Sequence, residues 1–225
     1  MPDIEFSANG STANGYLALP DSGPSHATVV LQEWWGLDSH IRGVCDRLAQ
    51  EGFVALAPDL YHGETAESRE EAQRLVMALS IEEAGKEMAG AVDFLAAHEQ
   101  VSGKGVGTLG FCLGGGLAVW TASANPKVAA TVTYYGLMRR GQPDLTKIRA
   151  PVLGHFGTQD QSISVEDARQ LERGLRDAGV DVTFCFYEGA GHAFFNDTNR
   201  LGTYDQDAAE LSWQRTTEFL HRHLA

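Results

Sequence analysis

The chain has 225 residues and a formal net charge of −13, with 43% hydrophobic and 21% charged residues. This composition is ordinary for a globular protein, and the length suffices for one α/β domain with a large core. We therefore expect residues 1–225 to form a single domain. The negative charge disfavours nucleic acids and anionic lipids as partners. No apolar run approaches the roughly 18 residues that a membrane span requires.

The cysteine pattern and the N-terminal residues predict a cytoplasmic protein. The chain starts without a charged segment followed by an apolar one, so we expect no secretory signal. Its three cysteines, Cys45, Cys112 and Cys185, are odd in number and far apart. This favours reduced thiols over a disulfide framework, and no pair has the spacing of a zinc site, so we expect no metal. Nothing in the pattern predicts an oligomeric state.

Strand-like and helical patterns alternate along the chain. Apolar runs predict strands at residues 15–20, 27–32, 53–58, 105–111, 128–136, 150–157 and 180–189. Apolar residues at helical spacing predict helices at residues 40–52, from about 68, along 81–95, and at 113–125, 165–179 and 207–223. This alternation predicts an α/β fold, a mostly parallel sheet with helices on both faces. Right-handed crossovers would place the strand-to-helix loops at one edge of the sheet.

The stretch GFCLGGG, which begins at Gly110, stands between an apolar strand and a helix. Gly110 and Gly114 permit a tight, strained turn that exposes the side chain of Cys112, as in a nucleophile elbow. The first amides of the following helix favour a thiolate and an oxyanion. The alternative is a small buried cysteine in a glycine-rich turn. Cys45 and Cys185 lie on a helix face and within a strand, so we predict that both are packing residues.

Two further residues would complete a catalytic triad with Cys112. A cysteine that attacks at neutral pH needs a general base, and His192 lies in a glycine-flanked loop after the last predicted strand. The supporting acid is expected between the nucleophile and the histidine in the chain. Asp160, shortly after a strand end, meets that condition and would orient the imidazole. Asp167 competes, but it lies in the first turn of a helix, where acids are common.

The loop after the second predicted strand supplies further candidates. An oxyanion hole would use the amide of Leu113, which follows the nucleophile, and a second amide, for which Trp34 is the candidate. Glu33 starts the same loop, and a carboxylate there needs a partner. Glu33 either forms a structural salt bridge, for example to an arginine, or acts as a carboxylate that tunes the thiol. The aromatic residues Trp35 and Phe194 are candidates for an apolar substrate pocket.

The motifs LQEWWGL, APDLY, GFCLGG, GTQD and GAGHAF together resemble those of the dienelactone hydrolase family. The resemblance implies an α/β-hydrolase fold and a cofactor-independent hydrolase of small carboxylic esters or lactones. It implies that Cys112 forms an acyl-cysteine, that His192 moves the proton and that Asp160 supports the histidine. It also implies that Glu33 holds the resting thiol neutral, which protects the sulfur from oxidation.

The chain departs from the dienelactone-specific members of that family, which grip a substrate carboxylate with two arginines. Arg69 matches the first by position, or is a solvated helix residue, whereas Asn196 stands at the second position. Gln73 and Val76 replace the aromatic pair expected after Arg69. Losing one arginine contact removes about 1.5–3 kcal/mol of binding. An acyltransferase or thioesterase with the same triad, and a non-catalytic binding module, are the alternative functions.

Overall fold

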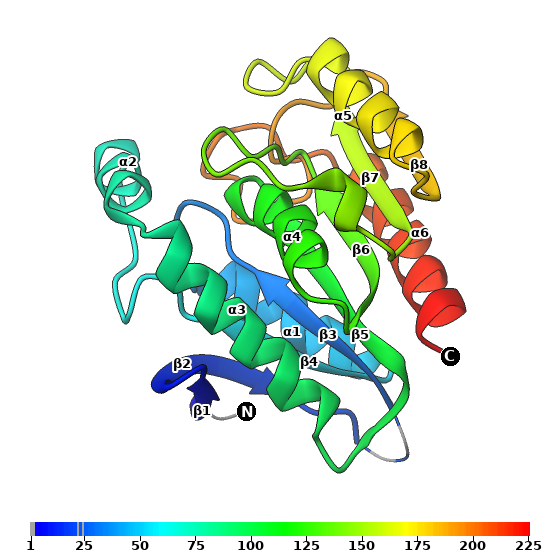
Figure 1. The fold of residues 1–225 in the computed structure, drawn as a ribbon. Helices are drawn as coiled ribbons and strands as arrows, with labels where there is room; N and C mark the ends of the chain where they lie inside the picture. The colour runs from blue at the N-terminus through cyan, green and yellow to red at the C-terminus, as the bar shows by residue number, and fades with distance from the viewer. Residues whose placement is uncertain (1–2, 22, 24) are drawn as a thin grey trace.

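The computed structural model describes residues 3–21, 23 and 25–225, and within them one sheet of eight strands forms the centre of the molecule (Figure 1). In chain order the strands are β1 (Asp3–Ala8), β2 (Ser11–Ala18), β3 (Ser25–Leu31), β4 (Phe53–Pro58), β5 (Val101–Phe111), β6 (Val128–Tyr134), β7 (Val152–Gly157) and β8 (Val182–Tyr187). They lie side by side in the order β1-β2-β4-β3-β5-β6-β7-β8. Only the β1–β2 and β2–β4 pairs are antiparallel, which confirms the predicted mostly parallel sheet.

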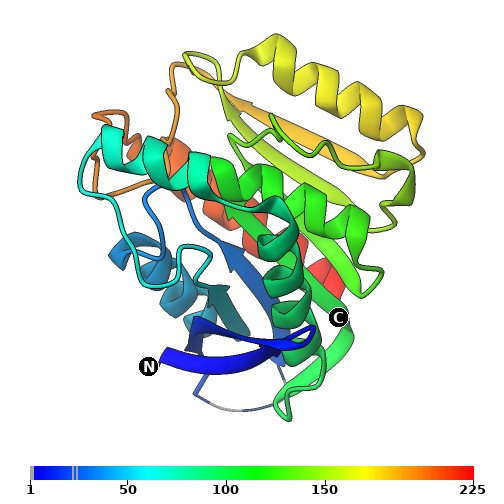
Figure 2. The same ribbon diagram turned by 60° about the vertical axis from the view of Figure 1, so that its left-hand side comes forward.

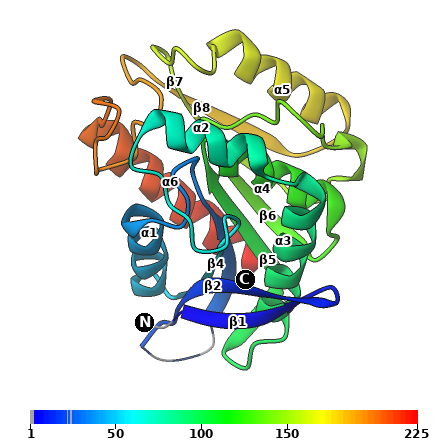
Figure 3. The ribbon, with the colours of Figure 1, turned by 90° about the vertical axis from the view of Figure 1, so that its left-hand side faces the viewer.

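Helices cover both faces of the sheet, as the alternating pattern predicts (Figures 2 and 3). They are α1 (Ser39–Gln50), α2 (Arg69–Ala78), α3 (Ile81–Ala96), α4 (Leu113–Ala124), α5 (Val165–Asp177) and α6 (Gln206–Leu224), with the short 3-10 helix η1 (Leu145–Lys147) before β7. On one face α1 and α6 contribute Ile41 and Leu220 to a buried cluster. On the other, α3, α4 and α5 contribute Met88, Leu117 and Leu175. Each face of the sheet therefore has its own apolar core.

The N-terminal edge differs from the sequence-based expectation. The sequence patterns did not reveal β1, and the strand predicted at residues 15–20 is β2, which starts earlier, at Ser11. Asn9 and Gly10 both have positive φ, 47° and 101°, and turn the chain between β1 and β2. An asparagine–glycine pair between two strands is a strong hairpin signal. Only Phe6 and Ala8 of the six residues of β1 are buried, which explains why its apolar pattern is weak.

The helices begin in two different ways. Five α-helices of the described chain start at a side chain that accepts a hydrogen bond from their first turn: Asp38, Ser68, Ser80, Ser164 and Asp205. The exception is α4, whose preceding residue is Cys112 and whose first turn has no side-chain cap. Since the first four amides of a helix have no partner within it, α4 leaves donors free for another acceptor.

The turn between β5 and α4 depends on two glycines that allow three backbone segments to meet. A Cβ atom on Gly110 would lie 1.9 Å from the carbonyl oxygen of Gly114, and one on Gly114 would lie 2.2 Å from the carbonyl oxygen of Leu31. Both distances are far below van der Waals contact. The resulting turn holds Cys112 at φ 53°, a left-handed conformation that is strained for a residue with a side chain.

We predict that Gly114→Ala destabilises the fold by about 1–3 kcal/mol or more, because the new methyl group must displace backbone atoms of β3. The matched control is Gly43→Ala in α1, where an added Cβ meets nothing within 4 Å. That substitution should stabilise the protein by about 0.5–1 kcal/mol, because alanine is the better helix former. Chemical denaturation measures both changes. Equal stability of the two variants would show that the turn has room to adjust.

Candidate active site

Cys112, His192 and Asp160 form a hydrogen-bonded row at the carboxyl edge of the sheet. The imidazole Nε2 of His192 lies 3.2 Å from the Sγ of Cys112, and its Nδ1 lies 2.8 Å from the Oδ2 of Asp160. The three side chains follow β5, β8 and β7, respectively. Loops at the carboxyl ends of parallel strands meet at one edge, which explains how residues so far apart in the chain come together.

The surroundings of the two candidate acids distinguish Asp160 from Asp167. The side chain of Asp160 is completely buried, and its Oδ1 accepts hydrogen bonds from the amides of Ser162 and Ile163 at 2.6 and 2.8 Å. Asp167 instead directs its carboxylate to the amide and hydroxyl of Ser164 at the start of α5. The structure therefore brings Asp160, and not Asp167, to the imidazole of His192.

The His192 imidazole has competing influences on its charge. Burial disfavours the imidazolium, but hydrogen bonds and charges from Asp160 and Cys112 outweigh it and raise the pKa of His192 from 6.5 to about 10. The contribution of Cys112 depends on a negative sulfur, so it acts only while the thiol is ionised. The Thr203 hydroxyl also donates to the backbone carbonyl of His192 at 2.5 Å and so steadies the loop.

Glu33 lies at the end of β3, where only 2% of its surface is exposed. Its Oε2 accepts a hydrogen bond from the side-chain amide (Nδ2) of Asn196 at 2.5 Å, and its Oε1 accepts one from the hydroxyl of Tyr135 at 3.3 Å. Its partners are thus an amide and a phenol rather than an arginine. Burial raises the pKa of Glu33, while the charge of His40 and the hydrogen bond from Asn196 act in the opposite direction.

Tyr135 is a residue of the site that the sequence patterns did not reveal. It directly follows β6 at the carboxyl edge and has a φ of 39°, a strained conformation for a tyrosine. Its ring centroid lies 5.1 Å from that of His192, and its hydroxyl binds Glu33. The signal that could have identified it is its place at a strand end, the same rule that identified Asp160.

The amides of Trp34 and Leu113 have no acceptor among the described residues. Both residues are partly exposed, and both pack against the same small apolar cluster beside the site. The close approach of Gly114 to the Leu31 carbonyl sets the first turn of α4 against the end of β3. Two loops that each carry a free N–H group are thereby held next to each other.

The three predicted substrate contacts have different surroundings. Trp35 is only 3% exposed, and its ring packs edge-on against Trp34, with the centroids 5.1 Å apart. Phe194 is completely buried and packs against aromatic rings such as that of Tyr187. Arg69 is exposed at the start of α2, with no hydrogen bond or ion pair to the rest of the described chain. Contact between a substrate and Trp35 or Phe194 would require this packing to open.

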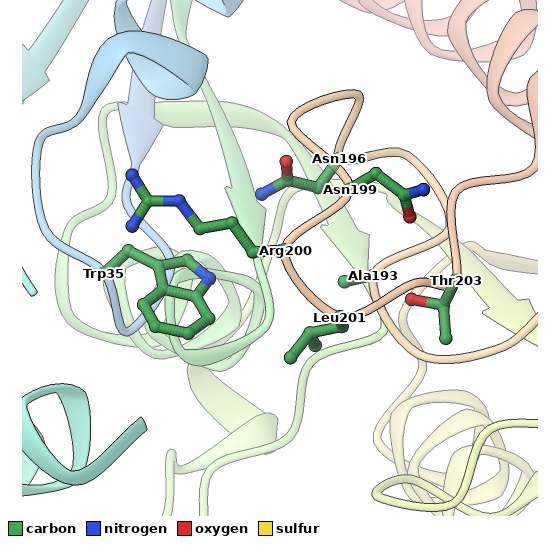
Figure 4. A pocket seen from close by; sticks show the side chains of 7 residues that line it. All are labelled: Trp35, Ala193, Asn196, Asn199, Arg200, Leu201 and Thr203. Carbon is green, nitrogen blue, oxygen red and sulfur yellow. The ribbon is translucent and has the colours of Figure 1, made fainter. Parts of the chain in front are cut away.

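A small hollow next to the loop that follows His192 has no room for a water molecule, and Figure 4 shows the side chains that line it. The guanidinium carbon of Arg200 lies 5.2 Å from the ring centroid of Trp35, and its Nη1 donates to the carbonyl of Ala66 at 2.8 Å. Asn196 borders the same hollow. Arg200 therefore ties the loop that follows His192 to the segment before α2.

A second, larger hollow lies away from these residues. It has a volume of about 520 Å³ and lies between α4 and α5, where Leu137, Met138 and Leu171 help to line it. None of the residues predicted for catalysis lines it. Within the described ranges, no three His, Cys, Asp or Glu side chains gather as a metal-binding group. Nor does any helix in them combine the length and apolarity needed to cross a bilayer.

The other two cysteines occupy packing positions. Cys45 is completely buried in α1, and Cys185 is partly buried in β8. Burial raises the pKa of both thiols. Because the thiolate is the reactive form, both are poor nucleophiles in comparison with a cysteine at a helix N-terminus.

Comparison with known proteins agrees with this geometry. A mostly parallel sheet with a strained nucleophile-type turn after β5 defines the α/β-hydrolase fold. The model of the dienelactone hydrolase family matches residues 13–224, and the chain belongs to this family.

Individual relatives extend over nearly the whole chain. Protein usf of Aquifex pyrophilus is 35% identical over 228 residues, which cover 98% of each chain. A protein of Aquifex aeolicus described as "Putative carboxymethylenebutenolidase" is 33% identical, again over 98% of each chain. A crystal structure from Klebsiella pneumoniae, described as that of a "Putative Dienelactone Hydrolase", has a TM-score of 0.87 and 28% identity and covers 98% of this chain and 97% of that one.

We predict that Glu33→Gln stabilises the fold at neutral pH. The folded protein, in which the pKa of Glu33 is raised, retains a proton at pH values where the unfolded chain, with a pKa near 4.5, has lost it. Native stability therefore falls as the pH rises above about 4.5, and the glutamine variant lacks this loss. Urea denaturation at several pH values should show a stability difference that is small in acid and grows toward neutral pH. A difference that stays constant over this range would contradict the raised pKa.

Proposed function

We propose that the chain hydrolyses small carboxylic esters or lactones through an acyl-cysteine intermediate. The row from the Sγ of Cys112 through the imidazole of His192 to Asp160, with contacts of 3.2 and 2.8 Å, is the observation that carries this proposal. The chain also belongs to a family named for the hydrolysis of a lactone.

In the acylation step, Cys112 is the nucleophile and His192 the proton carrier. The Nε2 of His192 takes the thiol proton as the sulfur attacks the substrate carbonyl carbon, and the C=O π pair moves onto oxygen. When the carbonyl re-forms, the C–O bond to the alcohol portion breaks, and the imidazolium gives its proton to the leaving alkoxide. Asp160 keeps the other ring nitrogen protonated and stabilises the imidazolium.

In the deacylation step, water repeats the same sequence. The Nε2 of His192 takes a proton from water while its oxygen attacks the thioester carbonyl. The S–C bond then breaks, the sulfur recovers its proton from the imidazolium, and a carboxylic acid is released. With a lactone, the alcohol portion stays attached to the acyl group, so the product is a single hydroxy acid.

The amides of Trp34 and Leu113 are the proposed donors to the oxyanion. They are free donors on two loops held against each other, and a preorganised donor loses no existing hydrogen bond when the oxyanion forms. The positive end of the α4 dipole points to the same place, because α4 begins at Leu113.

Glu33 is the proposed regulator of the resting thiol, and position 196 affects the substrate range. A carboxylate near the sulfur disfavours the thiolate by like-charge repulsion. Asn196 is hydrogen-bonded to Glu33, so it adds no positive charge to the site and offers no guanidinium to a substrate carboxylate. Arg69 remains the candidate for that contact. This composition favours esters and lactones that need at most one cationic contact.

We predict that Asp160→Asn lowers kcat for p-nitrophenyl acetate by roughly 1,000-fold to 10,000-fold, because the asparagine no longer holds His192 in the required tautomer. The matched control is Asp167→Asn, which removes a carboxylate that serves only the start of α5. Its kcat should equal that of the wild type, with a small loss of thermal stability. Spectrophotometric rates of p-nitrophenol release give both values.

Cys112→Ala is the test of the function itself. This variant should lose the p-nitrophenyl acetate activity, and intact-protein mass spectrometry of the wild type should show one acetyl group on Cys112. Full activity without the sulfur would refute the acyl-cysteine route. Rates with an added alcohol or thiol acceptor separate hydrolysis from acyl transfer.

We predict that Glu33→Gln makes Cys112 react faster with iodoacetamide. The substitution removes a negative charge near the sulfur and so increases the thiolate fraction. The gain should appear as the pH rises through the pKa of Glu33, because the wild-type carboxyl is uncharged below it. Alkylation rates measured across the neutral range test this. Identical rates at every pH would leave Glu33 a purely structural partner of Asn196 and Tyr135.

A further inference from the structure

Tyr61, three residues after β4, has a buried hydroxyl group with no hydrogen-bond partner in the described chain. Only 6% of the residue is exposed. Leaving a buried hydroxyl unpaired costs free energy, and nearly all such groups in folded proteins have partners. An exception next to a candidate active site suggests that the partner arrives with the substrate.

The backbone at Tyr61 is held firmly in place. The carboxylate of Asp59 accepts hydrogen bonds from the amides of Tyr61 and Gly63 at 3.2 and 2.6 Å. The amide of Leu60 donates to the side-chain oxygen of Gln32 at 3.2 Å, which joins this loop to the end of β3. The position of Tyr61 is thus tied to the strand that leads into the Glu33–Trp34 loop.

The ring of Tyr61 lies in the small apolar cluster at the site. This cluster includes Trp35 and Leu75, and both Trp34 and Leu113 pack against it. Trp34 and Leu113 are the residues whose amides form the proposed oxyanion hole. Tyr61 therefore brings a side-chain donor to the cluster against which the residues of the two backbone donors pack.

The charge state of Tyr61 suits a hydrogen-bond donor. Burial raises its pKa, and the negative charge of Cys112 raises it further. The second effect also requires the phenol to lie near the sulfur. The hydroxyl keeps its proton throughout the working pH range, so it can donate at every stage of the reaction.

Tyr135 is the other tyrosine at the site, but its hydroxyl is already engaged. It donates to the Oε1 of Glu33, and using it elsewhere would break that bond and leave a buried carboxylate with one donor fewer. Tyr61 has no such bond to lose.

We propose that the hydroxyl of Tyr61 is a third donor to the oxyanion. It donates a hydrogen bond to the carbonyl oxygen as the sulfur of Cys112 attacks and the C=O π pair moves onto that oxygen. The phenol proton stays on Tyr61 throughout, and the bond weakens again when the carbonyl re-forms. This role rests on the proposed acyl-cysteine function, since it requires that attack.

The test compares Tyr61→Phe with the matched control Tyr16→Phe. Tyr16 is also buried, but its hydroxyl donates to Asp46 at 2.8 Å, away from the site. We expect Tyr61→Phe to lower kcat for p-nitrophenyl acetate by roughly 100-fold, the usual effect of removing one oxyanion donor. Inhibition by acetaldehyde, which adds to the sulfur as a tetrahedral thiohemiacetal, should weaken by a similar factor. Tyr16→Phe should change neither quantity.

Two further measurements separate this role from its alternatives. Alkylation of Cys112 by iodoacetamide forms no oxyanion, so Tyr61→Phe should leave its rate unchanged. Thermal unfolding should show no loss of stability, because the removed hydroxyl has no partner among the described residues, whereas Tyr16→Phe should be less stable than the wild type.

Each contrary outcome has its own meaning. Unchanged kcat and acetaldehyde inhibition in Tyr61→Phe would overturn the third-donor role. So would a fall in the alkylation rate equal to the fall in kcat, because the hydroxyl would then act on the sulfur. Marked loss of stability would assign Tyr61 to the fold. If the wild type itself gains no acetyl group on Cys112, the acyl-cysteine function fails first, and the role of Tyr61 fails with it.

Discussion

The backbone contact at Gly110, Gly114 and Leu31 is the constraint on which the arrangement of the site depends. With no side chain between them, the end of β5, the start of α4 and the end of β3 touch one another. This contact holds Cys112 in its left-handed conformation and leaves α4 without a side-chain cap. It also sets the start of the Glu33–Trp34 loop against the first turn of α4. A bulkier residue at either glycine would separate Cys112 from its neighbours.

Two buried carboxylates beside one imidazole and one thiol have different surroundings. Asp160 accepts hydrogen bonds from two amides and from His192, so three N–H donors face it. Glu33 has only an amide and a phenol as hydrogen-bond donors, and burial raises its pKa. The difference suits Asp160 to support an imidazolium at His192. It suits Glu33 to release its proton only at a higher pH. The local number of donors, rather than the residue type, thus separates the proposed roles.

The segment after His192 connects the row of Cys112, His192 and Asp160 to neighbouring segments of the site. Asn196 contacts Glu33, and Arg200 reaches across to Trp35 and the carbonyl of Ala66. The side-chain amide of Asn196 and one N–H of Arg200 are thus already hydrogen-bonded within the protein. On the opposite side, Arg69 is exposed and unpaired within the described chain, and Tyr61 offers a free hydroxyl. In the proposed function, substrate selection therefore depends mainly on the β4–α2 segment.

Local sequence signals predicted the parallel sheet, the strained turn and the meeting of Cys112, His192 and Asp160, because strand-end motifs converge once the sheet is parallel. They did not reveal the features that depend on distant segments. β1 was missed because only two of its six residues are buried. Trp35 and Phe194 are buried because side chains from distant segments pack against them. The partners of Glu33 come from the residue after β6 and from the loop that carries His192. The free hydroxyl of Tyr61 can be recognised only from the structure, which shows that no described neighbour accepts a hydrogen bond from it. Burial and hydrogen-bond satisfaction depend on every segment that packs nearby, and no stretch of sequence contains that information.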